Sequence, residues 1–225
     1  MRHFLLFVIS LLGTLCSCGN GGQRNSTLPQ ATPDSLEAVQ EEPVRRGAIS
    51  TAHDTASFRE AFNQFFNALQ SGDTAALNNF VDAQQGFWLI EQPGAVPSYT
   101  HFNNIQSVKR QHPQSSFISI RERMEQCQLQ QRQDFPKFNC ADMDGAATGF
   151  EEDGCFYSTS TAAFRNADMW KYADLNEQQA AQIQQLQQQI EATVLHTSSS
   201  FKFHFGYRNG RWQLLFADLR VPCSA

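Results

Sequence analysis

The C-terminal run 201-FKFHFGYRNGRWQLLFADL-219 constrains the fold of this 225-residue chain more than any other segment. In its first half two sets of residues alternate: Phe201, Phe203, Phe205 and Tyr207 with Lys202, His204, Gly206 and Arg208. This period of two predicts a half-buried strand. The dipeptide Asn209-Gly210 then predicts a type I′ turn, because both central residues of that turn need a positive φ.

The second half of the run predicts the return strand of a hairpin. One face of that strand is expected to carry Trp212, Leu214 and Phe216. A lone hairpin is barely stable in water. The run therefore predicts a larger antiparallel sheet, of which this hairpin forms the C-terminal part.

Apolar residues at helical spacing begin soon after residue 51. A helix over residues 57–71 is predicted to present on one face Phe58, Phe62, Phe65, Phe66 and Leu69. Ser57 with Glu60 has capping-box spacing. Gly72 is a natural C-terminal stop, and Asp73 is expected to cap a short second helix.

The next segments predict a mixture of strands and helices. The run 86-GFWLIEQPG-94 predicts a strand, and residues 99–110 predict a third helix that ends before Pro113. The run 116-SFISI-120 is apolar enough for another strand. Residues 121–170 combine short strand-like stretches with loops.

A glutamine-rich helix is predicted over residues 174–195. Asp174 and Glu177 have capping-box spacing. A narrow apolar stripe is formed by Ile183, Leu186, Ile190 and Val194. The stripe lasts barely two heptads, which disfavours a coiled coil. We expect the helix to lie against the body with its glutamines in solvent.

This order of elements resembles the NTF2-like, or SnoaL-like, α+β cone. The matching parts are residues 57–110 and 200–219, whereas residues 121–196 depart from the family pattern. The resemblance implies a single α+β domain over residues 51–225, with N-terminal helices packed on a curved antiparallel sheet and a C-terminal hairpin. An unrelated α+β domain is the alternative.

The first residues indicate export. A basic start precedes an apolar run over residues 4–12, which is shorter than the about 20 residues of a membrane-spanning helix and typical of a signal peptide. Residues 15–18, LCSC, resemble the lipobox of bacterial lipoproteins. The resemblance implies a signal peptide over residues 1–17, cleavage before Cys18 and lipidation of its thiol, and so a membrane-anchored protein of the cell envelope, facing the periplasm or the cell surface. An ordinary signal peptide cleaved nearby is the alternative.

Residues 18–50 are predicted to form a disordered tether. They are rich in Gly, Pro, Gln and Ser, and without a periodic apolar pattern they cannot bury enough apolar surface to offset their ordering entropy. The net charge of the whole chain is -5. This charge disfavours a nucleic-acid partner, which needs a basic surface.

The body of the chain contains the disulfide candidates Cys127, Cys140, Cys155 and Cys223. An even number of cysteines in an exported chain indicates disulfides. Three pairings are possible, and loop length favours Cys140–Cys155, which leaves Cys127 for Cys223. The absence of CxxC spacing disfavours a zinc site.

Few residues suggest catalysis or metal binding. His204 is expected on the solvated face of its strand. The acidic loop over residues 140–155 could attract Ca²⁺ but departs from the EF-hand pattern at Ala146 and Ala147. Cys155 lies in a segment slightly similar to that of cysteine proteases, although a disulfide is the favoured state. We therefore assign no catalytic residue, metal or cofactor.

The family resemblance suggests two candidate ligand-binding residues. Some NTF2-like proteins are isomerases or cyclases with an Asp or Tyr inside the cone, which implies a place for Asp218 or Tyr207 in such a cavity. The preferred hypothesis is a non-catalytic binding or scaffolding module with a protein or small apolar ligand. The alternative is an NTF2-like enzyme or carrier for a small apolar ligand. A filled core with an exposed aromatic patch would favour the module, and an apolar cavity with a buried titratable group the enzyme.

Overall fold

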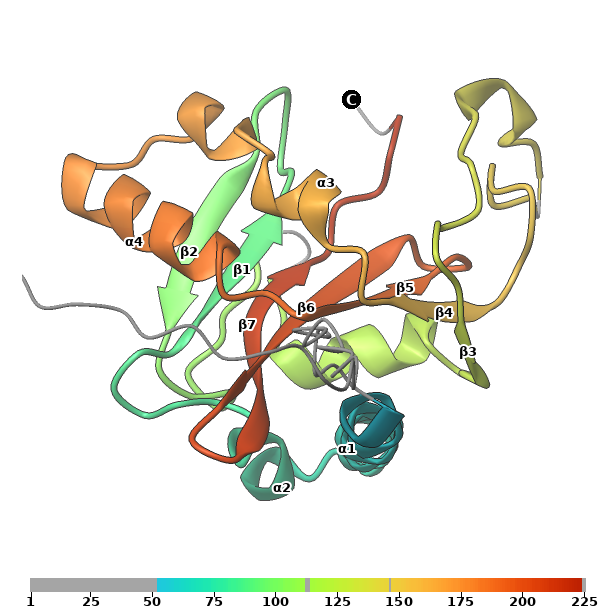
Figure 1. Ribbon diagram of the computed structural model, residues 1–225. Coiled ribbons are helices and arrows are strands. Elements are labelled where there is room, and N and C mark those ends of the chain that lie inside the picture. The colour runs from blue at the N-terminus through green and yellow to red at the C-terminus, as the bar shows by residue number, and fades with distance from the viewer. Residues whose placement is uncertain (1–51, 112–113, 146, 224–225) are drawn as a thin grey trace, which may run out of the picture. The chain divides into compact units, whose positions relative to one another are not determined.

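The computed structural model describes residues 52–111, 114–145 and 147–223. These residues form an α+β structure, as predicted (Figure 1). Its helices are α1 (Ala52–Ser71), α2 (Thr74–Asn78), α3 (Ala162–Arg165) and α4 (Glu177–Gln187), with the 3-10 helices η1 (Phe117–Arg123), η2 (Cys140–Asp142) and η3 (Met169–Tyr172). Its strands are β1 (Phe87–Glu91), β2 (Ser98–Phe102), β3 (Leu129–Gln131), β4 (Cys155–Ser158), β5 (Ala192–His196), β6 (Phe201–Arg208) and β7 (Arg211–Asp218).

The predicted signal peptide, Cys18 and the tether lie outside the described residues. Within the described part of the chain, no helix is long and apolar enough to cross a membrane.

The described strands form one open sheet in the order β2-β1-β7-β6-β5-β4-β3. Most neighbours are antiparallel, but β1 pairs with β7 and β3 with β4 in parallel. The sheet is therefore mixed, and the prediction of a purely antiparallel sheet was wrong at these two pairs. The return of the chain to the middle of the sheet as β7 makes it parallel to β1.

The C-terminal hairpin is present, with Asn209 and Gly210 at φ values of 52° and 77°. A β-bulge interrupts the ladder between β6 and β7: Phe205 lies opposite Leu214, but His204 lies opposite Phe216. Leu215 is therefore the extra residue, and the side chains beyond it change faces. The prediction that Trp212, Leu214 and Phe216 share a face was wrong for this reason.

One face of the sheet is covered by α1, α2 and η1 (Figure 1). The predicted stripe of α1 is buried except for Phe66, which is half-buried, and its rings pack on those of β6. The Phe65 ring lies edge-on to three others, with centroids 5.4 to 5.5 Å from those of Phe80, Phe203 and Phe205. The rings between α1 and this face of the sheet therefore form an aromatic core.

The N-terminus of α1 differs from the prediction, whereas its C-terminus agrees with it. The helix begins at Ala52, so Ser57 lies inside it and is not its N-cap. Gly72, at a φ of 74°, ends the helix, and Asp73 caps α2 by accepting a hydrogen bond from the Ala76 N–H at 2.9 Å. Both of these predictions are confirmed.

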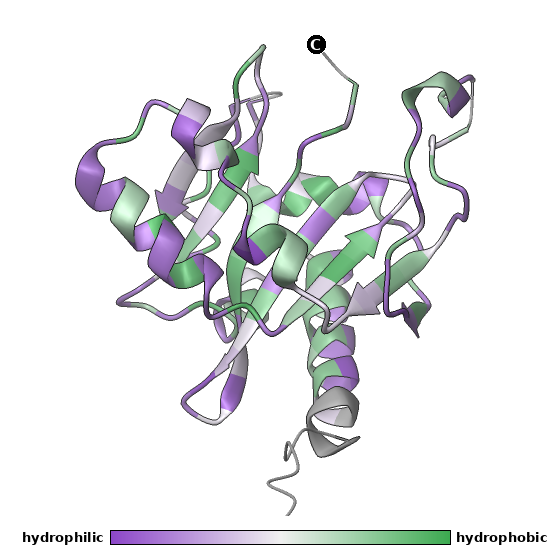
Figure 2. Cartoon of the chain, turned by 45° about the horizontal axis from the view of Figure 1, so that its top comes forward, coloured by the Kyte–Doolittle hydropathy of each residue, from purple (hydrophilic) through white to green (hydrophobic). Residues whose placement is uncertain are grey.

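The opposite face is covered by α3, η3 and α4. The α4 segment packs Ile183, Leu186 and Ile190 against residues of β1 and β7, and the rest of its surface is largely hydrophilic (Figure 2). Half of the glutamines in α4 are exposed, as predicted, but Gln187 is buried. The capping box of α4 is Asn176 with Gln179, not Asp174 with Glu177. The helix ends at Gln187, so Val194 lies in β5.

Two segments adopt a different secondary structure from the one predicted: a predicted helix contains a strand, and a predicted strand is a 3-10 helix. Residues 98–102 form β2, because β1 supplies a partner along the whole stretch, and no helix covers residues 99–110. The run 116-SFISI-120 lies in the 3-10 helix η1 instead of a strand. Phe117 and Ile120 are both fully buried there, since a spacing of three places them on one side.

The aromatic core predicts a clear difference between two neighbouring residues of α1. Replacing Phe65 by Ala should lower the free energy of unfolding by about 3–5 kcal/mol, because the lost ring leaves a cavity among three others. Phe66 is half-buried, so Phe66→Ala should have a clearly smaller effect. Denaturant unfolding under oxidising conditions measures both. Equal losses would contradict this description of the core.

Candidate functional site

The four body cysteines form two disulfides, Cys127–Cys155 and Cys140–Cys223, with Cα atoms 5.1 and 6.0 Å apart. The pairing favoured from loop length was wrong. Leu129 of β3 lies directly beside Cys155 of β4 in a parallel pair. This register brings Cys127, two residues earlier, to Cys155, and sheet pairing outweighs the advantage of the shorter loop.

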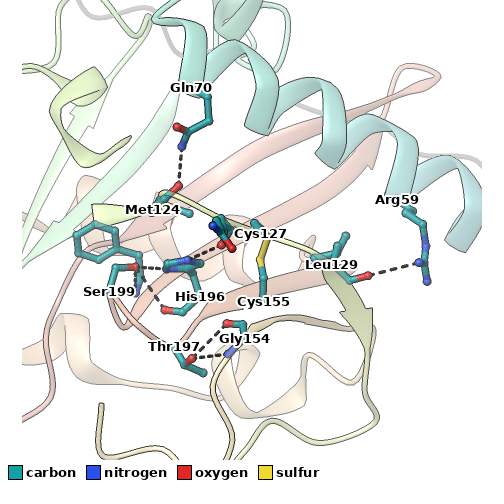
Figure 3. Close-up of a disulfide and its surroundings, with 12 residues drawn as sticks. Arg59, Gln70, Met124, Cys127, Leu129, Gly154, Cys155, His196, Thr197 and Ser199 are labelled. Carbon is teal, nitrogen blue, oxygen red and sulfur yellow. Dashed lines mark hydrogen bonds between the residues drawn. A yellow bond between two sulfur atoms is a disulfide. The ribbon is translucent and has the colours of Figure 1, made fainter. Parts of the chain in front are cut away.

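The Cys127–Cys155 disulfide is surrounded by hydrogen bonds that fix the chain before β3 (Figure 3). His196 lies opposite Cys155, and its Nε2–H donates to the Gln126 carbonyl oxygen at 3.0 Å. Its Nδ1 lies 2.8 Å from the Ser199 hydroxyl. Burial lowers the pKa of His196, so the ring is neutral near neutral pH. Cys155 is in a disulfide, as favoured from the sequence, and a disulfide sulfur is not a thiolate nucleophile, so the minor cysteine-protease alternative was wrong.

The acidic loop offers no metal centre in the described chain. Among the described residues, no group of three or more His, Cys, Asp or Glu side chains could hold a metal ion. Asp142 accepts a hydrogen bond from Asn139, Asp153 accepts one from Thr148, and Glu152 pairs with Arg132. These carboxylates make local contacts that stabilise the loop.

His204 is buried, and the prediction that it faces solvent was wrong. Its ring stacks on Phe164 of α3 with centroids 3.6 Å apart, and its Nδ1 lies 2.8 Å from the Thr193 hydroxyl. Within the described residues its Nε2 has no hydrogen-bond partner. Burial lowers the pKa of His204 to about 3, so the ring is neutral at physiological pH.

Asp218 is buried on the same face of the sheet as His204. Both of its carboxylate oxygens accept hydrogen bonds from Arg220, at 2.8 and 2.7 Å. Burial raises the pKa of Asp218, but the hydrogen bond and the charge of Arg220 outweigh that effect and bring the pKa below its usual value. Asp218 is therefore a paired anion without a proton to exchange at neutral pH.

Tyr207 lies far from Asp218 along the hairpin and on the α1 side of the sheet. It lines a groove of about 400 Å³ between α1 and the tip of the hairpin. This groove is called the hairpin groove below, and its lining is formed by Ser57, Glu60, Ala61, Gln64, Asn79, Phe80, Tyr207, Gly210, Arg211 and Trp212. The two ligand-binding candidates from the sequence, Tyr207 and Asp218, are not brought together.

The hairpin turn positions the two aromatic residues of the hairpin groove. Tyr207 lies opposite Trp212 across the strands, with ring centroids 5.3 Å apart and planes 64° apart. The Trp212 indole N–H donates to the Ser57 hydroxyl on α1 at 3.2 Å. Trp212 is buried, whereas 42% of Tyr207 is exposed. The groove thus has a fixed aromatic wall with one open face.

The polar side of the hairpin groove was missed by the sequence analysis. Glu60 and Gln64 lie one helical turn apart on the exposed side of α1, and Asn79 follows α2. Two aromatic residues that flank an Asn-Gly turn were the available signal, because the tip of a hairpin extends beyond the core. No local sequence pattern indicated that α1 packs beside the tip of the hairpin.

Comparison with protein-family models, with curated proteins and with solved structures found no match.

Acid should destabilise the protein through His204. The folded pKa is about 3 and the ordinary value is 6.5, so on acidification the unfolded chain binds a proton that the folded chain does not. This contribution to stability is complete above pH 6.5 and declines as the pH falls towards 3, by about 1.4 kcal/mol per pH unit. The lowered pKa of Asp218 adds a loss only below its ordinary value of 3.8.

Urea unfolding of the wild type and of His204→Gln between pH 7 and 4.5 measures this effect. The stability of the variant should depend less steeply on pH, by about one proton. His196, which is buried in both proteins, leaves a common residual slope. Identical slopes would contradict a buried neutral His204.

Proposed function

We propose that this chain is a lipid-anchored protein of the bacterial cell envelope whose body is a non-catalytic binding module. The lipobox-like sequence that ends at Cys18 supports the anchor. The two disulfides support a compartment outside the cytoplasm, because disulfides persist in oxidising environments. The tether of residues 18–50 would separate the body from the membrane surface.

The observation that carries the binding function is the hairpin groove beside a filled interior. Small-molecule sites are concave and open to their ligand. Beneath α1 the space is occupied by rings such as Phe62, Phe65 and Phe205, which pack against each other. The concave surface with an exposed aromatic residue lies instead at the hairpin tip.

The contacts of the buried titratable groups give little support to the enzyme or carrier alternative. Asp218 is neutralised by Arg220, and His204 is covered by Phe164 of α3. Both lie on the side of the sheet opposite α1. The NTF2-like cone remains part of the proposal, supported by α1 on one face and by the C-terminal hairpin. The α3–α4 layer on the other face is then an addition to that pattern.

The anchor predicts that one of two neighbouring cysteines carries lipid. Full-length protein in growing bacteria should incorporate radioactive palmitate, and Cys18→Ala should abolish the label because it removes the acceptor thiol. Cys16→Ala is the matched control and should keep the label, since Cys16 would leave with the signal peptide. Label retained in Cys18→Ala would refute this anchor.

The hairpin groove predicts a local response to ligands. The chain contains three tryptophans, whose indole N–H signals can be assigned by substitution. Soluble peptide and saccharide fractions of bacterial envelope polymers should be added separately to the ¹⁵N-labelled full-length protein in micelles. At least one fraction should shift the Trp212 signal and leave that of Trp170 unchanged, and Tyr207→Ala should reduce the shift at a given concentration of the fraction. No response of Trp212 to either fraction would refute the binding site.

A further inference from the structure

The hairpin groove presents the exposed Tyr207 ring on a backbone and a neighbouring ring that are anchored by hydrogen bonds. Trp212 is tied to α1 by its bond to Ser57, and the Tyr207 backbone N–H donates to the Glu191 carboxylate at 3.2 Å. The Tyr207 and Trp212 rings pack in a T-shaped arrangement, and Tyr207 is exposed whereas Trp212 is buried. A flat, pre-positioned ring of this kind is a surface on which the C–H face of a sugar ring can pack, with little loss of side-chain freedom on binding.

The polar residues of the hairpin groove suit a ligand with many hydroxyl groups. Gln64 and Asn79 each offer an amide donor and acceptor, and Glu60 offers two acceptor oxygens. The Gln64 side-chain amide donates a hydrogen bond to one Glu60 carboxylate oxygen at 3.5 Å, so their polar groups form one row along α1. The two charged residues, Glu60 and Arg211, are of opposite sign. The groove therefore favours a neutral ligand over a phosphorylated or cationic one.

The backbone around the hairpin groove offers little to a peptide. Peptides are bound by a free strand edge or by a broad apolar groove. Here β7 pairs with β6, and the Leu214 N–H on its other side donates to the Phe80 carbonyl oxygen at 2.8 Å. The apolar floor consists of Ala61 and the edge of Phe80, which is 8% exposed. Phe80 thus takes one backbone donor on the side of β7 away from β6, and the groove offers a peptide no wide apolar surface.

From this lining we infer that the hairpin groove binds a neutral saccharide, stacked on Tyr207 with its hydroxyls hydrogen-bonded by Glu60, Gln64 and Asn79. A volume of about 400 Å³ lies near the small end of ligand pockets, which suits about one or two sugar rings. This inference rests on the proposed binding function and names the ligand class of the same site.

The test is an NMR titration of the full-length protein in micelles, read from the indole N–H of Trp212. The probes are neutral di- to tetrasaccharides of glucose, galactose, mannose and N-acetylglucosamine, and neutral tripeptides to pentapeptides. At least one saccharide should shift the signal in a saturable way. Tyr207→Ala should weaken its binding about tenfold, or roughly 1.4 kcal/mol, and Tyr207→Phe should retain it.

Two further variants separate the hairpin groove from general effects. Gln64→Ala should weaken saccharide binding, because it removes hydrogen bonds without touching the aromatic wall. Tyr172→Ala is the matched control: Tyr172 is 64% exposed in η3 on the opposite side of the sheet, and its loss should change nothing. Unfolding midpoints of all variants show whether each remains folded.

The other outcomes overturn the inference in distinguishable ways. Peptides that bind through Tyr207 while no saccharide binds would refute the saccharide and leave the hairpin groove as a binding site. Saccharide binding that is insensitive to Tyr207→Ala would place the sugar elsewhere and refute the inference. No response of Trp212 to any probe would count against both the groove and its ligand class.

Discussion

The pairing of β6 with β7 is the interaction on which the rest of the structure depends. One extra residue, Leu215, reverses the side-chain pattern of β7 halfway along its length. Before the bulge, Trp212 and Leu214 face α1. After it, Phe216 faces α4. Both faces of β7 are apolar, and each fully buried side chain of this size stabilises the fold by about 1.5–3 kcal/mol. Helices are therefore needed on both sides of the sheet.

Because helices cover both faces of the sheet, the polar side chains near the C-terminal end of β7 are buried. A β7 strand without a bulge would place Asp218 and Phe216 on the side of Trp212. The bulge places Asp218 beside His204 beneath the second helical layer, where Arg220 pairs with the carboxylate. These groups are buried in that layer, and the tip of the hairpin, beyond the core, exposes Tyr207. The pairing of β6 with β7 therefore accounts both for the filled interior and for the groove at the tip of the hairpin.

Sequence periodicity predicted the elements whose stability is mainly local. The hairpin followed from alternation and from Asn209-Gly210, and α1 followed from its apolar stripe and its stop at Gly72. The bulge at Leu215 has no local signature, because it depends on the match between two strands. The strand β2 was predicted as a helix, since only its partner β1 supplies its hydrogen bonds. His204 was placed in solvent because its cover, Phe164, lies 40 residues earlier in sequence.

The candidate site was predictable only on its hairpin side. Tyr207 was recognised from the strand pattern, but its opposite wall comes from α1. Ser57 and Trp212, which join the two sides, are 155 residues apart in sequence. The cysteine pairing failed for a related reason, because the parallel β3–β4 register overrides loop length. Both the groove and the cysteine pairing depend on contacts between residues that are distant in sequence, and a local sequence pattern does not reveal such contacts.

A filled interior with a surface groove differs physically from an enzyme-like cavity. Xenon enters dry apolar cavities in proteins and is readily located in pressurised crystals. Crystals of this protein under xenon should show no xenon atom between α1 and the sheet, because Phe62, Phe65 and their neighbours occupy that space. A well-occupied xenon site among these rings would contradict the account and restore the interior ligand cavity.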